Sequence, residues 1–308
     1  MADREGARGG KAESGAAAAT GSRAGFVALL GPPNVGKSSL LNALLGERLA
    51  IVSPRPQTTR SRILGILPRG QAQILFLDTP GRHRGAKTMN ETLNAIVDEA
   101  ARDCDVALLL VDSTRGWSEV HDELLRALAP KAAGLVVVET KTDLPAAANA
   151  SPIPEALAPG VVRVSARRRV GLERLLDAIV ERLPISPPLY GEDELTDRPV
   201  RWLCAERIRE AAMGLLDEEV PHAIAVELHA FDESDPRLVR IRADLLVERD
   251  SQKRIVVGKG GQQIKQIGVR ARESIEAFLE RRVHLELFVK VDPRWSQSAR
   301  RMAELGYH

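Results

Sequence analysis

Residues 31–38 read Gly31-Pro32-Pro33-Asn34-Val35-Gly36-Lys37-Ser38, and this stretch decides the fold of the chain around it. An apolar run, Phe26 to Leu30, precedes it, and a segment with helical spacing, Ser39 to Leu45, follows it. A strand, a glycine loop and a helix with the spacing G-x-x-x-x-G-K-[ST] are typical of a phosphate-binding loop. The alternative is a chance glycine-rich turn, which would need neither the strand nor the helix. We therefore predict a nucleotide site.

The residue types of this loop follow from the chemistry of a polyphosphate. Gly31 and Gly36 let the backbone turn its N–H groups toward phosphate oxygens, and the start of the next helix adds a positive partial charge. Lys37 is expected to reach the β- and γ-phosphates, and the Ser38 hydroxyl is expected to ligate Mg²⁺. We predict that all eight loop residues and Ser39 line the nucleotide.

The length of 308 residues predicts a globular chain of about two domains. The formal net charge is only +2, so a contact with nucleic acid needs a local basic patch. Aromatic residues make up 3% of the chain, which argues against an aromatic base-stacking sheet. Cys104 and Cys204 lack metal-ligand spacing, so we expect buried free thiols in a reducing cytosol.

The sequence shows neither a membrane span nor a signal peptide. Its longest apolar run, Val106 to Val111, is far shorter than the roughly 20 residues of a span and predicts a buried strand. Residues 1–24 are rich in alanine, glycine and scattered charge without a compact apolar stretch. We predict that they form a disordered tail.

The segment 51–60 contains two prolines, which exclude a regular element. Its threonines, Thr58 and Thr59, suit a loop that orders around a γ-phosphate and its Mg²⁺, and either of them can be the one that contacts the metal. The alternative is a solvated turn with polar residues. We predict a switch segment that includes both threonines.

A second motif, Asp78-Thr79-Pro80-Gly81, ends an apolar run from Gln71 to Leu77. This run and the preceding one, Ser61 to Leu67, predict a β-hairpin. The Asp78 carboxylate at the end of a buried strand suits a direct or water-mediated partner of Mg²⁺. The Gly81 N–H can approach a γ-phosphate because no side chain obstructs it. We predict that residues 78–81 contact the nucleotide.

Beyond this motif, segments with helical spacing (89–101, 120–128 and 172–183) alternate with apolar strands (105–111, 134–138 and 161–164). This order predicts a mostly parallel sheet with helices on both faces. Ligands of such sheets bind at the carboxyl ends of the strands. The phosphate loop and Asp78 both fall at this edge.

The next motif at this edge, Thr140-Lys141-Thr142-Asp143, indicates the base. One carboxylate, Asp143, can accept from both N1–H and the 2-amino group of guanine. Adenine would leave it unpaired, at a cost of ~1–3 kcal/mol or more. The Lys141 stem would lie over the base. Ser165-Ala166-Arg167 follows the 161–164 strand and would offer backbone N–H groups to guanine O6. The alternative is an exposed charged loop.

In this order and spacing the motifs resemble the five G-motifs of translation-factor-type GTPases, and residues 31–38, 57–60 and 78–81 resemble the Era family specifically. The resemblance implies that Lys37, Thr59 and Gly81 are catalytic and that Ser38, Thr59 and Asp78 hold Mg²⁺. The sequence departs from the pattern twice. Thr140 stands where the family has asparagine, and the residue after Gly81 is Arg82, which we also predict beside the nucleotide. No water-orienting amide is supplied, so we expect slow hydrolysis that needs a partner or K⁺.

The second half of the chain follows a proline- and charge-rich linker, predicted at 185–198. Residues 200–216 have helical spacing, and residues 224–228, 239–245 and 283–291 alternate with period two. Three half-buried strands with helices on one face predict an α+β domain.

Within this half, a G-x-x-G loop between two predicted helices points to RNA. Bare glycines let a nucleic-acid backbone approach, and nearby basic side chains would face its phosphates. The predicted RNA contacts are Lys253, Gly258, Lys259, Gly260, Gly261, Lys265, Arg270 and Arg272. A helix cap followed by a turn is the alternative.

Residues 247–272, 283–287 and 305–307 resemble the type II KH domain of the Era family. The whole resemblance covers about residues 25–308. It implies a bacterial ribosome-assembly GTPase that uses GTP or GDP with Mg²⁺ and binds the 3′ end of small-subunit (16S) rRNA in the 30S subunit. It also implies a cytoplasmic monomer with loose peripheral contact to the cell membrane.

The predicted organisation is a tail (1–24), an α/β P-loop GTPase domain (25–184), a linker (185–198) and an α+β type II KH domain with a C-terminal extension (199–308). Two other interpretations stay open. One is an RNA-binding assembly module with a degenerate nucleotide site, which Thr140 and Arg82 favour. The other is a small-molecule kinase that uses ATP, against which Asp143 argues.

Overall fold

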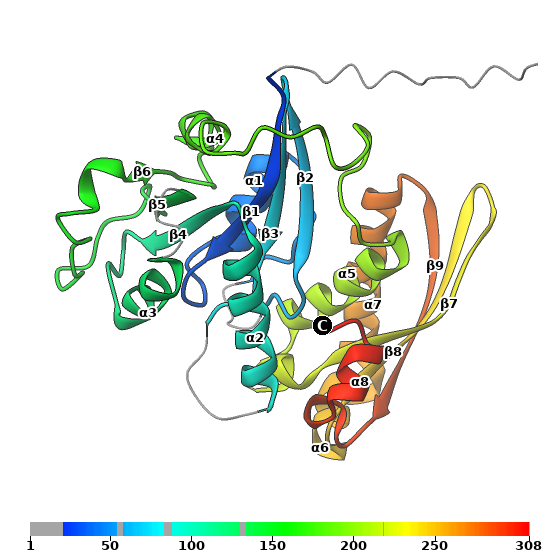
Figure 1. Ribbon diagram of the computed structural model, residues 1–308. Coiled ribbons are helices and arrows are strands. Elements are labelled where there is room, and N and C mark those ends of the chain that lie inside the picture. The colour runs from blue at the N-terminus through cyan, green and yellow to red at the C-terminus, as the bar shows by residue number, and fades with distance from the viewer. Residues whose placement is uncertain (1–20, 54–57, 83–87, 130–133, 218, 308) are drawn as a thin grey trace, which may run out of the picture.

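The computed structural model describes residues 21–53, 58–82, 88–129, 134–217 and 219–307, which form two layered domains side by side (Figure 1). The predicted disorder of residues 1–20 and the two prolines of the predicted switch lie outside this range. The first strand begins at Arg23, so two residues assigned to the tail belong to the first domain.

The first domain is built on a six-stranded sheet with the order β2-β3-β1-β4-β5-β6, in which only β2 runs antiparallel to its neighbour. This confirms the predicted mostly parallel sheet. Its strands are β1 (Arg23–Leu30), β2 (Ile63–Arg69), β3 (Ala72–Asp78), β4 (Val106–Asp112), β5 (Leu135–Thr140) and β6 (Val162–Arg163).

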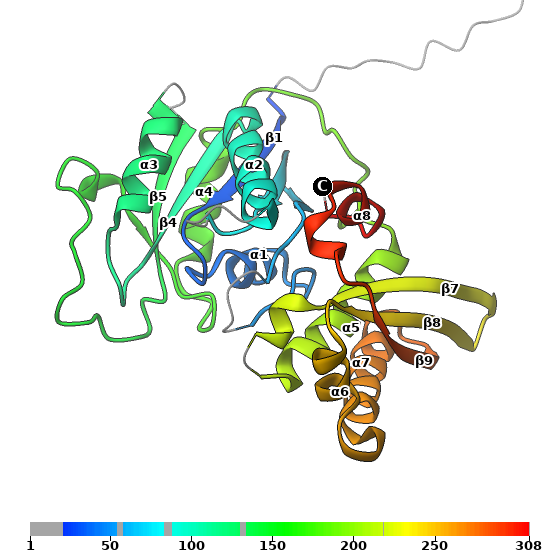
Figure 2. The same ribbon diagram turned by 90° about the horizontal axis from the view of Figure 1, so that it is seen from below.

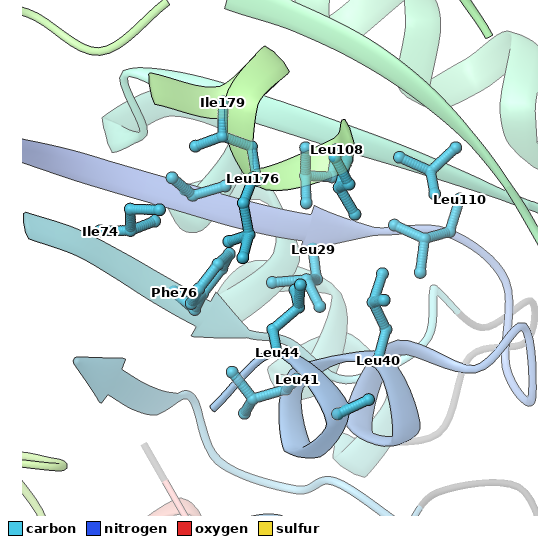
Figure 3. Packing of buried hydrophobic residues seen from close by; sticks show 14 of the residues in the cluster. Leu29, Leu40, Leu41, Leu44, Ile74, Phe76, Leu108, Leu110, Leu176 and Ile179 are labelled. Carbon is cyan, nitrogen blue, oxygen red and sulfur yellow. The ribbon is translucent and has the colours of Figure 1, made fainter. Parts of the chain in front are cut away.

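Helices cover both faces of this sheet. Helices α1 (Lys37–Leu45) and α4 (Leu172–Val180) pack on one face, where Leu40, Leu176 and Phe76 meet in the core that Figure 3 shows. Helices α2 (Thr88–Asp103) and α3 (Glu119–Leu128) cover the other face. Burying one such side chain stabilises the fold by roughly 1.5–3 kcal/mol. Both faces are buried, which explains why the strands read as continuous apolar runs.

The strand register brings the motifs together. Leu29 of β1 pairs with Asp78 of β3, and Asp112 of β4 pairs with Thr140 of β5. The phosphate loop, the Asp78 motif and the Thr140 motif therefore share one edge of the sheet. The predicted strand ended at residue 138, two residues early, because Thr140 is itself the last residue of β5.

The predicted linker follows the edge of the first domain. Ile185 forms a β-bridge with Arg23, the amide of Gln73 exchanges hydrogen bonds with the backbone of Leu189 and Tyr190, and the Ile66 N–H donates to Leu195. These contacts fix a segment that composition alone described as semi-rigid.

The second domain confirms the predicted α+β fold. In its sheet, β8 (Leu238–Val247) lies between antiparallel β7 (Ala225–Asp235) and parallel β9 (Arg282–Val291). Helices α5 (Val200–Leu215) and α7 (Gln262–Leu279) form the core with one face of the sheet. Helix α6 (Asp250–Val257) precedes α7, and the G-x-x-G loop between them contains the short turn η4 (Lys259–Gly261). Two further short turns are η2 (Ala158–Gly160), in the first domain, and η3 (Val220–Ala223).

The prediction that helices cover only one face of this sheet was incomplete. The C-terminal segment, with η5 (Trp295–Gln297) and α8 (Ala299–Glu304), packs Trp295 and Tyr307 on the other side, against Ala225 and Leu246. In Figures 1 and 2, α8 lies between the second sheet and α2. The reason is visible in β8, where the alternation stops and residues 245–247 are all buried.

Among the described residues, no helix has the length and apolar character needed to cross a bilayer. Cys104 and Cys204 are buried free thiols, as predicted. Burial raises the pKa of Cys204 to about 12, which keeps its thiol protonated.

Candidate functional site

The phosphate loop depends on glycine at its points of closest approach. Gly31 and Gly36 have φ of 152° and 105°, a region that other residues rarely adopt. A Cβ on Gly31 would lie 2.9 Å from the Leu110 carbonyl oxygen, and one on Gly81 would lie 2.7 Å from the Pro33 nitrogen. The two motifs are thus in direct backbone contact.

Three predicted metal ligands meet beside this loop. The Ser38 hydroxyl donates to Asp78 Oδ2 at 2.7 Å, and Thr59 Oγ1 lies 2.9 Å from Ser38 Oγ and 3.2 Å from the same carboxylate oxygen. The other oxygen, Asp78 Oδ1, is buried and has no hydrogen-bond partner among the described residues. Hydroxyl and carboxylate oxygens suit Mg²⁺, so the donor set and the orphaned oxygen fit this ion.

A buried lysine faces the same point. Lys37 is 6% exposed, and its Nζ donates to the carbonyls of Gly31 (3.2 Å) and Pro32 (3.0 Å). Burial lowers the pKa of Lys37 to about 8, against the attraction of Asp78. Burial raises the pKa of Asp78 to about 6, against hydrogen bonds from Ser38 and Thr59 and the charge of Lys37. At neutral pH both are charged, and a phosphate with its cation would compensate both.

The geometry separates the two threonines of the switch segment. Thr59 is buried, and its hydroxyl lies beside Ser38 and Asp78. The Thr58 carbonyl instead accepts a hydrogen bond from Arg209 of α5. Both threonines line a cavity of about 410 Å³ together with loop residues, Gly81 and Lys141. The cavity wall also contains Ile51, Val52 and Ser53 from the predicted switch segment, and Arg115, which no motif indicated.

The side chains of Thr79, in the second motif, and of Arg82, directly after it, turn away from this cavity. The Arg82 guanidinium pairs with Asp98 of α2 and Glu123 of α3, and only its backbone N–H reaches the loop, at 3.4 Å from Gly31 O. The Thr79 hydroxyl is buried and donates to the Leu29 carbonyl at 2.7 Å. We predicted both residues beside the nucleotide; their side chains are bonded within the domain, Thr79 to a backbone carbonyl and Arg82 to two carboxylates.

Thr140 supports the loop from the far side. Its buried hydroxyl lies 2.7 Å from the Val35 carbonyl, to which it donates, and 3.2 Å from Val111 O. Lys141 Nζ donates to the Asn34 carbonyl at 2.6 Å and pairs with Asp112 at 2.7 Å. The hydroxyl at residue 140 therefore braces the phosphate loop, in the place of the family's amide.

The two motifs assigned to the base are less buried than the phosphate loop: Asp143 is half-buried and Arg167 is exposed, whereas Val35 and Lys37 are buried. Asp143 accepts a hydrogen bond from the Ser165 hydroxyl at 2.7 Å, and this bond holds the pKa of Asp143 below its usual value. Ser165 Oγ in turn accepts from the Arg168 N–H at 3.1 Å, which fixes the turn that contains Ala166 and Arg167. The Thr142 N–H donates to Val164 at 3.3 Å. The two motifs that we assigned to guanine are thus held side by side.

The second domain presents a hollow of about 290 Å³ between α7 and β9. Leu285 and Leu287 of β9 line it together with Lys265 and Arg272 of α7. Arg270 lies elsewhere, on the α5 side of α7, where a Cβ on Gly214 would meet its guanidinium at 3.1 Å. Arg270 lines a second hollow, of about 660 Å³, and Lys265 lines both hollows.

Comparisons with known proteins agree with this architecture. The pattern of the family described as 50S ribosome-binding GTPase matches residues 26–141, and that of the KH domain matches residues 219–296. The GTPase Era of Geotalea uraniireducens is 41% identical over 293 residues, covering 92% of this chain and 98% of the relative. The GTPase Era of Pseudomonas aeruginosa is 41% identical over 294 residues, covering 93% and 96%. The chain belongs to the Era family of GTPases.

Two solved structures of Era superpose on this family member with a TM-score of 0.85 at 37% identity. One is a complex with MgGDPNP and nucleotides 1506–1542 of 16S ribosomal RNA, and covers 93% of this chain and 99% of its own. The other is an Aquifex aeolicus Era variant bound to GDP·AlF4⁻, and covers 92% and 99%. The predicted family, GTPase activity and KH fold are thereby confirmed.

Besides Arg115, sequence reasoning missed two residues in this Era-family chain, Asp112 and Arg209. Asp112, which holds Lys141, was detectable as a carboxylate that ends a buried apolar strand. Arg209, which bonds to Thr58, carried no such signal, because it lies 151 positions away in a helix of another domain.

Proposed function

We propose that this Era-family GTPase is a GTP-dependent switch that binds 16S rRNA near its 3′ end during assembly of the 30S subunit. The proposal rests on one observation. Lys37, Ser38, Thr59 and Asp78 lie together at the phosphate loop of a chain whose KH domain also has a hollow between α7 and β9. A relative that covers 93% of this chain was crystallised with MgGDPNP and 16S rRNA nucleotides, which supports both halves.

Hydrolysis here needs positioning and charge compensation rather than a covalent nucleophile. Water attacks the γ-phosphorus, a new P–O bond forms, and the bond to the β–γ bridging oxygen breaks, which releases GDP and phosphate. Lys37 would neutralise charge on the β- and γ-oxygens. Bound Mg²⁺ supplies further neutralisation, and Ser38, Thr59 and Asp78 would hold it. The Gly81 N–H would face the γ-phosphate.

No side chain at residue 82 is directed at the attacking water, because Arg82 is paired with Asp98 and Glu123. We therefore propose slow intrinsic turnover that rises with a partner or with K⁺. Comparing rates in KCl and NaCl tests the ion, and adding 30S subunits tests the partner.

For the base, Asp143 would accept from guanine N1–H and the 2-amino group, and the Lys141 stem would cover the ring.

For RNA, the glycine loop of the KH domain and the hollow between α7 and β9 would bind single-stranded nucleotides, with Lys265 and Arg272 toward phosphates. A monomer in the cytoplasm with loose peripheral membrane contact completes the proposal. Sedimentation and binding to anionic vesicles test these points.

The deciding experiment measures phosphate release from GTP and from ATP, with and without an RNA of the 16S 3′ end. We expect turnover of GTP only, and faster turnover with RNA. Asp143→Asn should lose GTP turnover and gain XTP turnover, because xanthine has a carbonyl at C2 to which an asparagine amide can donate. A folded protein without turnover of any nucleotide would leave only an RNA-binding module, and turnover of ATP would favour the kinase interpretation.

A further inference from the structure

Three residues that flank the proposed metal ligand Thr59, namely Thr58, Arg60 and Ser61, are bonded to the other domain. The Thr58 carbonyl accepts from Arg209 of α5, Arg60 donates to carbonyls of residues 221–224, and the Ser61 hydroxyl donates to Gly306 O at 2.7 Å. Thr59 itself bonds inward, to Ser38 and Asp78. The switch segment is therefore held on both sides of its metal-facing residue by the KH half of the chain.

Arg60 is enclosed by that half. It is 1% exposed, its Nη atoms donate to Ile224 O at 2.5 Å and His222 O at 2.9 Å, and its guanidinium lies over the rings of Trp295 (5.4 Å) and Tyr307 (5.7 Å). Burial and the nearby charge of Arg209 hold the pKa of Arg60 below its usual value. Hydrogen bonds to carbonyls and contacts with aromatic faces stabilise a guanidinium only in particular orientations. We therefore expect Arg60 to move when the carbonyls and rings that surround it move.

Arg209 forms the second attachment. It is fully buried and pairs with Glu206 at 2.6 and 2.8 Å, so its direction toward Thr58 is fixed within α5. The neighbouring Glu210 accepts from the Val52 N–H at 3.3 Å and pairs with Arg48 at 2.6 Å. Helix α5 thus contacts the segment ahead of the threonines as well.

The C-terminal segment that carries Trp295 and Tyr307 also contacts the first domain at a second place. Its η5 turn packs on α2, the helix that follows the Asp78–Gly81 motif, and Figure 2 shows α8 beside α2. The same segment covers one end of the KH sheet. It therefore connects the KH sheet with Arg60, through Trp295 and Tyr307, and with α2.

We propose that Arg60 and Arg209 are positioning residues through which the KH domain holds Thr59 at the metal site and so sets the rate of GTP hydrolysis. This rests on the proposed function and names how it is regulated. Linkage makes the effect reciprocal: if RNA shifts the KH pocket and changes Thr59, then a bound γ-phosphate changes the affinity for RNA by the same factor. Couplings of this kind are about 5- to 150-fold.

The test compares Arg60→Lys with Arg207→Lys in the full chain. Lysine keeps the positive charge of Arg60 but lacks the planar guanidinium with its several N–H donors. Arg207 is a matched control, because it also bridges the domains, from its Nη2 to the Arg48 carbonyl at 3.0 Å, without touching residues 58–61. We would measure single-turnover GTP hydrolysis against Mg²⁺ concentration, GDP affinity, and RNA affinity with GDP and with a non-hydrolysable GTP analogue.

We expect Arg60→Lys to slow hydrolysis and raise the half-saturating Mg²⁺ by about fivefold or more. GDP affinity and RNA affinity with GDP should stay within about twofold, and the analogue should no longer change RNA affinity. Arg207→Lys should behave as wild type. Ser61→Ala, which removes one milder bond, should show the same pattern at about two- to fivefold, and decides the matter if Arg60→Lys does not fold.

Equal effects of Arg60→Lys and Arg207→Lys, or wild-type values in the folded switch variants, would overturn the inference while leaving the proposed function intact. A wild-type chain that does not hydrolyse GTP would instead remove the proposed function.

Discussion

The loop at residues 31–38 and the loop at residues 258–261 both set a lysine among glycines in front of a helix, α1 in the first domain and α7 in the second. In both, glycines take positive φ, from 59° at Gly260 to 152° at Gly31. The lysines differ. Lys37 is buried and bonded to two carbonyls, whereas Lys259 is exposed.

The surroundings explain this difference. Gly31 lies against the Leu110 carbonyl and Val35 is held by Thr140, so the first loop is enclosed by the sheet edge. A Cβ on Gly258 would lie 2.6 Å from Gln263 Cβ, but one on Gly260 or Gly261 would meet nothing within 4 Å, so the second loop is open at these two glycines. An enclosed loop fits one small ligand and fixes its geometry, while an open one lets a long backbone approach from outside. The same residue types therefore give selectivity in one place and accessibility in the other.

The largest effect should come from Lys37→Met. Because the buried ammonium would face the β- and γ-phosphates, its loss should slow GTP turnover about 100-fold or more. RNA affinity without nucleotide should stay within about twofold. Phosphate release and RNA titration measure both. A parallel loss of RNA affinity in a folded variant would mean that the two loops do not act as separate sites.

The carboxylate of Asp78, whose charge attracts Lys37, gives a pH-dependent prediction. Asp78 has a pKa of about 6, so it gains a proton as the pH falls through 6, and a protonated carboxyl cannot ligate a metal. The half-saturating Mg²⁺ for GTP hydrolysis should rise about tenfold between pH 7.5 and 5, since about one carboxylate in ten stays ionised there. Asp177→Asn, at an exposed carboxylate of α4, should leave the rise unchanged.

The same group affects stability with the opposite sign from a usual aspartate. Its folded pKa lies above its ordinary value of 3.8, so between pH 6 and 4 the folded chain binds a proton that the unfolded chain does not. Asp78 alone therefore makes the nucleotide-free protein more stable as the pH falls through this window. Denaturant titrations measure the free energy of unfolding at pH 7 and 5. Relative to Asp78→Asn, the wild type should gain free energy of unfolding at the lower pH, and an equal change in both proteins would contradict the prediction.

The phosphate end of the site was predictable from sequence because its chemistry works at short spacing. A polyphosphate and a hard cation demand particular residue types next to a strand end, and Lys37, Ser38 and Asp78 are brought together as their motifs indicated. The order of strands and helices was equally readable, because both faces of the first sheet are apolar.

Long-range partners were not predictable. Arg82 sits in a switch motif, but two carboxylates on other helices decide where it points. Arg60 reaches carbonyls more than 160 positions away, and no local spacing encodes such a pair. The C-terminal cover was missed because Leu246 interrupts the alternation for only one residue.

A smaller effect should follow from Thr140→Val, which keeps the shape but removes the hydroxyl that braces the enclosed loop. The buried Val35 carbonyl would lose that donor, at about 1–2 kcal/mol, so nucleotide affinity should fall roughly 5- to 30-fold. Thr140→Ser keeps the hydroxyl and should stay near wild type. Calorimetric titration with GDP separates the two variants, and equal affinities would mean that the loop needs no brace at residue 140.

The smallest effect should come from Lys259→Ala in the open loop. An exposed lysine that faces phosphates contributes mainly by releasing a counterion, so RNA affinity should fall about three- to tenfold at moderate salt. The slope of log affinity against log salt should decrease by about 0.7, the value for one contact with a single strand. Lys290→Ala removes the same charge from β9, where alternation places residue 290 on the face opposite Leu285 and Leu287. If this control lowers RNA affinity and the salt slope as much as Lys259→Ala does, the RNA responds to the overall charge of the domain. A loss confined to Lys259→Ala, with GTP turnover in the absence of RNA unchanged, would mean that the open loop contacts the RNA backbone and serves no part of the enclosed site.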